Sequence, residues 1–182
     1  SQEFNLHPFI CGVKRHKKDP SFLAFANDGL SITMNFSLNK IKNKDKEKYC
    51  DKLIEYIPTM EDRIKKTSVN ASKIASFLET LDKIKKVYHP SLRSNESHIL
   101  ASTYFKYMPS VISFELDMNI TEAKAFMKNI KGVDYKTSFG AKETKFDTWP
   151  RKISNSTTLC RLAMGTNCNL ESLYNEFQRK LN

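Results

Sequence analysis

The stretch that decides the fold is VISFELDMNITEAKAFMKNIKG, residues 111–132. Its first six residues, Val111–Leu116, are rich in β-branched and aromatic side chains, which is typical of a strand. Thr121 is a favourable N-cap, and the apolar spacing that follows predicts a helix over 122–131, closed by Gly132. A strand followed directly by an amphipathic helix predicts helices packed on a sheet.

Toward the C-terminus, residues 157–164 alternate in a way that predicts a second strand, which we expect beside 111–116. The alternation places two sets of side chains on opposite faces: Leu159, Arg161 and Ala163 on one, and Cys160, Leu162 and Met164 on the other. Gly165 ends this strand, and Asn169 is a suitable cap for a final helix over 170–181.

Toward the N-terminus, apolar spacing predicts a long helix from Met60 to Leu81 and a shorter one over 95–107. Their expected apolar sides comprise Ile64, Ile74, Phe77, Leu78 and Leu81 in the first and Ile99, Leu100, Tyr104 and Tyr107 in the second. Residues 87–90, 134–138 and 142–147 are expected to be extended. The predicted fold class is therefore α/β, an α+β sandwich with a small mixed or antiparallel sheet and helices packed on it.

Pro58 marks the most natural boundary, because proline ends the helix expected over 44–57. We therefore predict an N-terminal segment, 1–58, with short strands and that helix, and a second region, 59–182. Within the segment, Leu30–Phe36 alternates apolar and polar residues, which indicates a half-buried strand after the turn signal Asn27-Asp28-Gly29.

Composition excludes several classes of protein. The 182 residues are 40% hydrophobic and 27% charged, with no apolar run of transmembrane length and no signal-peptide pattern, so we expect a cytoplasmic protein without a membrane partner. The four cysteines form no CxxC pair and the four histidines form no ligand motif. We expect reduced thiols and no metal site.

A net charge of +10 is the unusual bulk property. Such a charge attracts nucleic-acid phosphates without specificity, so a basic nucleic-acid-binding protein stays open as an alternative. The lysines fall mostly on the polar faces of the expected helices, which favours a solvated surface.

Five stretches of the second region carry a resemblance. They are R-x₆-NA-x-KIA-x-FL at Arg63–Leu78, KKVYHPSLRSNESHILA at 85–101, VISFEL-x₅-EAKAFMKNIK from 111, SFGAKET at 138–144 and LCRLAMG at 159–165. In this order they resemble the C-terminal domain of the Cys/Met-metabolism enzymes that use pyridoxal phosphate (PLP), of the cystathionine γ-synthase and lyase type. Departures are Ala141 at a glycine position, and Tyr104–Pro109 in place of a glycine-rich stretch.

The resemblance implies a role for two residues. Arg161 matches the family's arginine that binds the substrate's α-carboxylate, and Ser138 matches a serine near the same site. A planar guanidinium suits a carboxylate because it donates two parallel hydrogen bonds. The residues themselves leave an alternative open, in which Arg161 pairs with an internal Asp or Glu.

PLP is implied by the family, but the resemblance places the Schiff-base lysine, phosphate cradle and acid in a large domain that is not matched here. We therefore expect no cofactor on this chain alone and a partial substrate domain that is inactive by itself, with a partner chain or a homo-oligomer and a small anionic ligand. A non-catalytic binding or assembly module that kept the fold is an alternative.

Residues 8–36, PFICGVKRHKKDPSFLAFANDGLSITMNF, show a weaker resemblance. They are similar to the substrate domain of FAD-linked oxidases of the decaprenylphosphoryl-ribose oxidase type. That similarity implies an active-site role for Lys14, and FAD as a cofactor. A fragment related to those oxidases is thus a further alternative.

Overall fold

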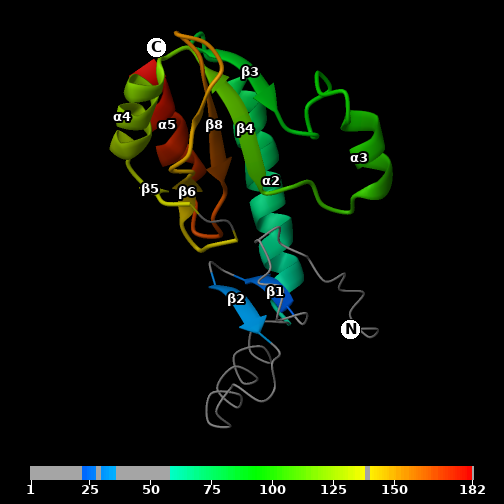
Figure 1. Ribbon diagram of the computed structural model, residues 1–182. Helices are drawn as coiled ribbons and strands as arrows, with labels where there is room; N and C mark the ends of the chain where they lie inside the picture. The colour runs from blue at the N-terminus through cyan, green and yellow to red at the C-terminus, as the bar shows by residue number, and fades with distance from the viewer. Residues whose placement is uncertain (1–21, 28–29, 36–57, 138–139, 182) are drawn as a thin grey trace.

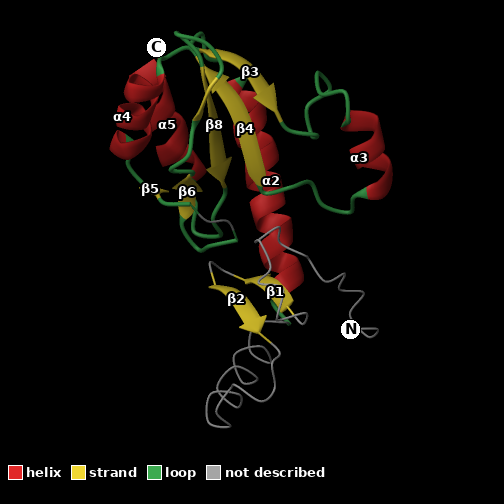
Figure 2. Cartoon of the chain, viewed as in Figure 1, coloured by secondary structure: helices red, strands yellow, loops and turns green. Residues whose placement is uncertain are grey.

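The structure is a computed structural model that describes residues 22–27, 30–35, 58–137 and 140–181 (Figures 1 and 2). In the N-terminal segment, β1 (Phe22–Asn27) and β2 (Leu30–Asn35) pair antiparallel, from Phe22 opposite Asn35 to Asn27 opposite Leu30. The strand expected at 30–36 is therefore present. The helix expected over 44–57 lies outside the described residues.

The second region is built on a six-stranded mixed sheet in the order β3-β4-β8-β6-β5, with β7 also paired to β8. The strands are β3 (Ile84–Tyr88), β4 (Val111–Leu116), β5 (Val133–Tyr135), β6 (Thr144–Phe146), β7 (Arg151–Lys152) and β8 (Thr158–Ala163). Only the β5–β6 pair among these is parallel. The fold class and the expected adjacency of 111–116 and 157–164 are confirmed.

Three helices cover one face of this sheet, and Figure 1 shows them as one layer. They are α2 (Met60–Leu78), α4 (Ile120–Asn129) and α5 (Leu170–Leu181). A short helix, α3 (His98–Tyr104), stands apart from that layer beyond the end of β3. No helix in the described parts of the chain is long and apolar enough to cross a membrane.

Four phenylalanines hold the helix layer to the sheet. Phe114 and Phe146 project from the strands with ring centroids 6.4 Å apart, and Phe146 meets Phe126 of α4 at 6.2 Å and Phe177 of α5 at 6.2 Å. Phe114, Phe146 and Phe177 are fully buried. Tilted and edge-on ring pairs at such distances add to the gain from burying large apolar area, so this cluster is the centre of the core.

Several boundaries predicted from the sequence were wrong. The cap of α4 is Asn119, whose side chain accepts from the backbone N–H groups of Thr121 and Glu122, while the Glu122 side chain accepts from the Asn119 N–H. This reciprocal capping box satisfies end groups that the expected cap, Thr121, lies too far along the chain to reach. Helix α2 ends at Leu78 rather than Leu81, and α3 is much shorter than the expected 95–107.

Two predicted apolar sides are also corrected. Ile64 is 44% exposed at the start of α2, and α3 buries only Ala101 among its seven residues. Its apolar spacing is present, but the helix lies away from the sheet, so the expected contact surface has nothing to pack against within the described residues. Periodicity predicts a face, and the position of the helix decides whether that face is buried.

Candidate functional site

The face of the sheet opposite the helix layer carries a row of polar side chains in register. Tyr88 of β3 stands opposite Ser113 of β4, which stands opposite Arg161 of β8. Asp147 follows β6, and its backbone N–H donates to the Arg161 carbonyl at 3.0 Å, which continues the β6–β8 pairing by one residue. Side chains of directly opposed residues share a face, so these four form a line across four strands.

Arg161 and Asp147 form an ion pair at the middle of this face. The Arg161 Nη2 atom lies 3.1 Å from Asp147 Oδ2, with 35% of the arginine side chain exposed and 14% of the aspartate's. The guanidinium therefore has an internal carboxylate on one side and solvent on another. The ion pair with Asp147 corresponds to the alternative in which Arg161 pairs with an internal acid, and its exposed part corresponds to the alternative in which it binds a ligand. The role of Arg161 in binding a substrate stays a prediction.

Asp147 is held in place by other donors. Its Oδ1 atom accepts from the Thr137 hydroxyl at 2.7 Å and from the Trp149 backbone N–H at 3.3 Å. These bonds fix the orientation of the carboxylate toward Arg161. The sequence did not single out Asp147, because only the β6–β8 register places it opposite Arg161.

A second acid on this face is already engaged. The Tyr88 hydroxyl donates to Glu115 Oε1, and this hydrogen bond raises the pKa of the Tyr88 phenol above its ordinary value. Lys145, on the same face as Arg161 and opposite Ala163, is 8% exposed. The uncovered face thus carries both signs of charge within a few residues of Arg161.

Gly165, which ends the LCRLAMG motif, lies against residues 142–144 of the SFGAKET motif. A Cβ atom on Gly165 would lie 2.3 Å from the Lys142 carbonyl oxygen and 2.5 Å from the Thr144 nitrogen. The Gly165 N–H donates to Thr144 Oγ1 at 3.1 Å, and the Asn167 N–H donates to the Lys142 carbonyl at 2.8 Å. Only a residue without a side chain permits this backbone approach, so residues 142–144 and Gly165 pack in direct contact.

Ser138 and Lys14 both lie outside the described residues. Thr137, the residue before Ser138 in the sequence, donates its hydroxyl to Asp147 Oδ1.

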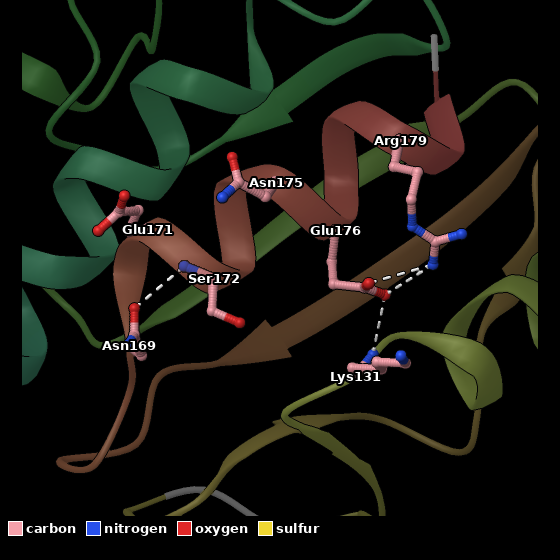
Figure 3. Close-up of a pocket in the computed structure, with 7 residues that line it drawn as sticks. All are labelled: Lys131, Asn169, Glu171, Ser172, Asn175, Glu176 and Arg179. Carbon is pink, nitrogen blue, oxygen red and sulfur yellow. Dashed lines mark hydrogen bonds and ion pairs between the residues drawn. The ribbon is translucent and has the colours of Figure 1, made fainter.

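A separate open hollow of about 360 Å³ lies on the helix-covered side (Figure 3). Its lining comprises Lys131, Asn169, Glu171, Ser172, Asn175, Glu176 and Arg179. Glu176 accepts from the Lys131 N–H at 3.2 Å and pairs with Arg179 at 3.1 Å, and these contacts lower the pKa of its carboxyl group. Because its most buried charge is already paired, this hollow is the weaker candidate for a site.

Cysteine and metal chemistry find little support in the described residues. Burial raises the pKa of the Cys160 thiol to about 12, and burial also raises that of Cys168, so neither is a thiolate at neutral pH. Within residues 58–137 and 140–181, no three His, Cys, Asp or Glu side chains lie close enough to hold a metal ion. Cys11 and Cys50 lie outside the described residues.

The described region is an α/β domain with a helix-covered face and a polar face centred on a half-buried arginine. Residues 46–159 match the family model of the Cys/Met metabolism PLP-dependent enzymes. The chain belongs to that family.

Relatives and solved structures agree with this assignment. The chain is 30% identical over 118 residues to cystathionine gamma-lyase of Mus musculus, covering 65% of this chain and 30% of the relative, and 38% identical over 89 residues to cystathionine beta-lyase of Lactococcus lactis, covering 48% and 23%. An O-acetylhomoserine (thiol)-lyase from Campylobacter jejuni superposes with a TM-score of 0.58 at 27% identity, over 68% of this chain and 29% of that one. The chain thus spans under a third of these relatives' length.

The comparisons give no support to the resemblance of residues 8–36 to FAD-linked oxidases, because the family match begins at residue 46. The roles of Lys14 and FAD stay predictions from that resemblance alone.

Among the described residues, Lys131, Arg179, Lys145 and the Gly165 amide do not together form a PLP site. Lys131 and Arg179 line the hollow on the helix-covered side, whereas Arg161 lies on the polar face of the sheet. Lys145 shares a face with Arg161 but is 8% exposed, and the Gly165 amide is occupied by Thr144, so neither offers a Schiff-base amine or a free phosphate donor. The Campylobacter enzyme, by contrast, carries a pyridoxyl-lysine phosphate.

Proposed function

We propose that residues 60–181 form the substrate-recognition domain of a transsulfuration enzyme of this family. In this proposal Arg161 binds the α-carboxylate of an amino acid, and a PLP-binding domain outside the described residues supplies the chemistry. The described region by itself would then bind ligand and catalyse neither lyase nor transferase reactions.

The observation that carries the proposal is the position of Arg161. It stands in the middle of a strand, on the face without helices, and a third of its side chain reaches solvent. An arginine that serves only to stabilise the fold is held best by a carboxylate that accepts two parallel hydrogen bonds from its guanidinium. Asp147 instead contacts one terminal nitrogen of Arg161. The remaining N–H groups can receive a ligand carboxylate.

Ligand binding can be measured with the chain's own reporter. Trp149 is the only tryptophan, lies two residues from Asp147 and bonds to it through its backbone N–H. We expect L-alanine or L-cysteine to change Trp149 fluorescence in the native chain. Arg161→Met should abolish the response, and Arg161→Lys should weaken it, because lysine keeps the charge without the two parallel donors.

Arg151 provides the matched control. It is an exposed arginine on β7, paired with Leu159 along the same edge of β8 as β6, whereas β4 occupies the other edge. Arg151→Met removes the same charge at a short distance and should leave the response unchanged. An equal loss in Arg151→Met would show nonspecific attraction to a basic surface, and a full response in Arg161→Met would contradict the proposal.

The proposal that the cofactor is bound outside the described residues is tested with PLP itself. After incubation with PLP and borohydride reduction, we expect scattered, substoichiometric labelling of exposed lysines in the chain alone. Stoichiometric labelling of one lysine, mapped by peptide mass spectrometry, would contradict the proposal that the cofactor belongs to another domain. Lys145 is the position to inspect first, because it shares the face of Arg161.

A further inference from the structure

We infer that helix α3 is a contact surface between two copies of this chain, in which the two α3 helices pair antiparallel about a two-fold axis. The contact is made by the α3 patch, which we define as the exposed apolar residues Ile99, Leu100, Tyr104 and Phe105. Their exposed fractions run from 54% for Phe105 to 81% for Ile99. The inference is independent of the proposed function, because none of these residues belongs to the polar row that contains Arg161.

The α3 patch is one continuous apolar surface. A helix turns by about 100° per residue, so Ile99, Leu100 and Tyr104 fall within about 140° of its circumference, with Thr103 between them. The Thr103 hydroxyl donates to the Ile99 carbonyl at 2.9 Å, so it adds no unsatisfied polar group to this surface. Ala101, the buried residue of α3, marks the side of the helix that faces the rest of the protein.

Contacts before and after α3 hold the helix in place. His89 Nε2 lies 2.9 Å from the Pro109 carbonyl oxygen, which joins the two ends of the segment that carries α3. The Tyr107 hydroxyl donates to Glu61 of α2 at 2.7 Å, and Leu92 is buried in the core. Apolar side chains gathered on one fixed element, rather than scattered singly, mark an interaction site.

The charges around the α3 patch favour a second copy as its partner. Residues 97–105 contain no Asp, Glu, Lys or Arg, in a chain whose net charge is +10. Two copies repel each other over most of their surface, so an uncharged patch is where they can approach. Patches of this kind offer nothing to the phosphates of a nucleic acid, which bind lysine and arginine.

The two ends of the α3 patch carry opposite charges. Glu96 precedes the patch and Lys106 follows it, and both are exposed. Lys106 contacts Glu61 of its own chain, and 72% of its side chain remains exposed to a further partner. Antiparallel pairing brings Glu96 of one copy beside Lys106 of the other, whereas parallel pairing would set like charges together.

The order of residues along α3 also fits a two-fold contact. Ile99 and Leu100 lie at one end and Tyr104 and Phe105 at the other, so antiparallel copies place each aliphatic pair on an aromatic pair. With about 200 Å² for each whole side chain, the exposed fractions correspond to roughly 500 Å² per copy. A total of about 1,000 Å² is at the low end of specific interfaces, which predicts a weak dimer.

Sedimentation velocity of the full chain at about 10–500 µM tests the inference. We expect a monomer–dimer equilibrium that strengthens between about 0.05 M and about 0.5 M salt, because salt screens the repulsion between the chains and leaves the apolar contact intact. Ile99→Glu should raise the dissociation constant by at least about tenfold, since it buries an unpaired charge in the contact.

Ile153→Glu is the matched control, because it makes the same change of charge at an isoleucine that is 50% exposed and lies outside α3. It should leave the dimer unchanged, and circular dichroism confirms that each variant is folded. A chain that stays monomeric, an association that weakens as salt rises, or equal losses in Ile99→Glu and Ile153→Glu would overturn the inference. Each of these results leaves the proposed function intact, since it concerns Arg161.

The direction of pairing is tested by reversing one end charge. Glu96→Lys makes both ends of α3 basic and should weaken the dimer by about threefold to tenfold. Asp82→Lys makes the same change in the exposed turn before β3 and should weaken the dimer clearly less. Equal effects of Glu96→Lys and Asp82→Lys would overturn the antiparallel arrangement.

Discussion

The two faces of the sheet are built from the same strands and yet have opposite character. Along β4, Ile112, Phe114 and Leu116 are fully buried under helices, while the residues between them are half-exposed on the polar face. Along β8, Cys160 and Leu162 are buried and Arg161 is a third exposed. A strand with one face covered can thus supply the core and the site from alternate residues.

The difference teaches where substitutions should matter. Apolar area removed from water stabilises the fold by about 25 cal/mol per Å², so the helix-covered face holds most of the stability. The polar face contributes little to stability, and its ion pair and hydrogen bonds are free to serve a ligand. The following predictions test this division.

The largest expected effect is on the covered face. Phe114→Ala should lower the free energy of unfolding by about 3–5 kcal/mol, because it removes a fully buried ring that packs on Phe146. Its neighbour Ser113→Ala, on the polar face, should change stability by less than about 0.5 kcal/mol. Urea denaturation of both variants measures this, and similar losses in the two would contradict the division.

A second effect is expected where the two motifs meet. Gly165→Ala should cost roughly 1–3 kcal/mol, because its Cβ would overlap the 142–144 backbone, which cannot move without separating the motifs. Gly132→Ala is the control: nothing lies within 4 Å of its Cβ, and only its φ of +77° opposes the change, at about 1 kcal/mol. Thermal unfolding should rank Gly165→Ala as the less stable, and the reverse order would contradict the close approach.

A third prediction concerns the helix layer. Asn119→Ala should destabilise the protein by about 1 kcal/mol, because two backbone N–H groups of α4 lose their acceptor. Thr121→Ala should have a clearly smaller effect, since the cap is not its side chain. Larger destabilisation by Thr121→Ala would indicate that Thr121, the N-cap predicted from the sequence, is the residue that caps α4.

A fourth prediction depends on pH. His89 is fully buried, with Nε2 2.9 Å from the Pro109 carbonyl and Nδ1 2.7 Å from the Ser91 hydroxyl. A carbonyl only accepts, so the neutral ring donates from Nε2 and accepts at Nδ1, and burial lowers its pKa below 6.5.

The unfolded chain therefore binds more protons than the folded one at acid pH. Stability should fall as the pH decreases below about 6.5 and should level off below the lower folded pKa. Chemical denaturation at pH values from about 7.5 to about 5, the range around the ordinary histidine pKa, measures this loss. His89→Gln should show a shallower decline, and an equally steep one would assign the pH dependence to other groups.

The smallest effect is expected on the polar face. Glu115→Gln should return the raised pKa of Tyr88 toward its ordinary value, because the hydrogen bond to the carboxylate is its main cause. Stability should hardly change, since Tyr88 is 37% exposed. Following the Tyr88 ring signals by NMR against pH measures the shift, and an unchanged titration would contradict the bond.

Local pattern predicted the elements well where it was long and regular. The strand at 111–116 and the helix at 170–181 agree with the structure at both ends, and Asn169 caps that helix through a hydrogen bond to the Ser172 N–H. The apolar side of α3 was predicted from the same kind of pattern and is exposed. Spacing describes one helix at a time, whereas burial depends on what lies beside it.

The sequence by itself determined the alternating faces of β4 and β8 and the family resemblance, and it singled out Arg161 as a candidate site residue. These follow from the chemistry of single residues and from a side-chain period of two along a strand. Only the tertiary structure decided that Asp147 faces Arg161, that Thr137 and Trp149 orient it, and that Gly165 joins two distant motifs. Strand register and backbone approach are relations between segments far apart in the chain, and no local preference encodes them.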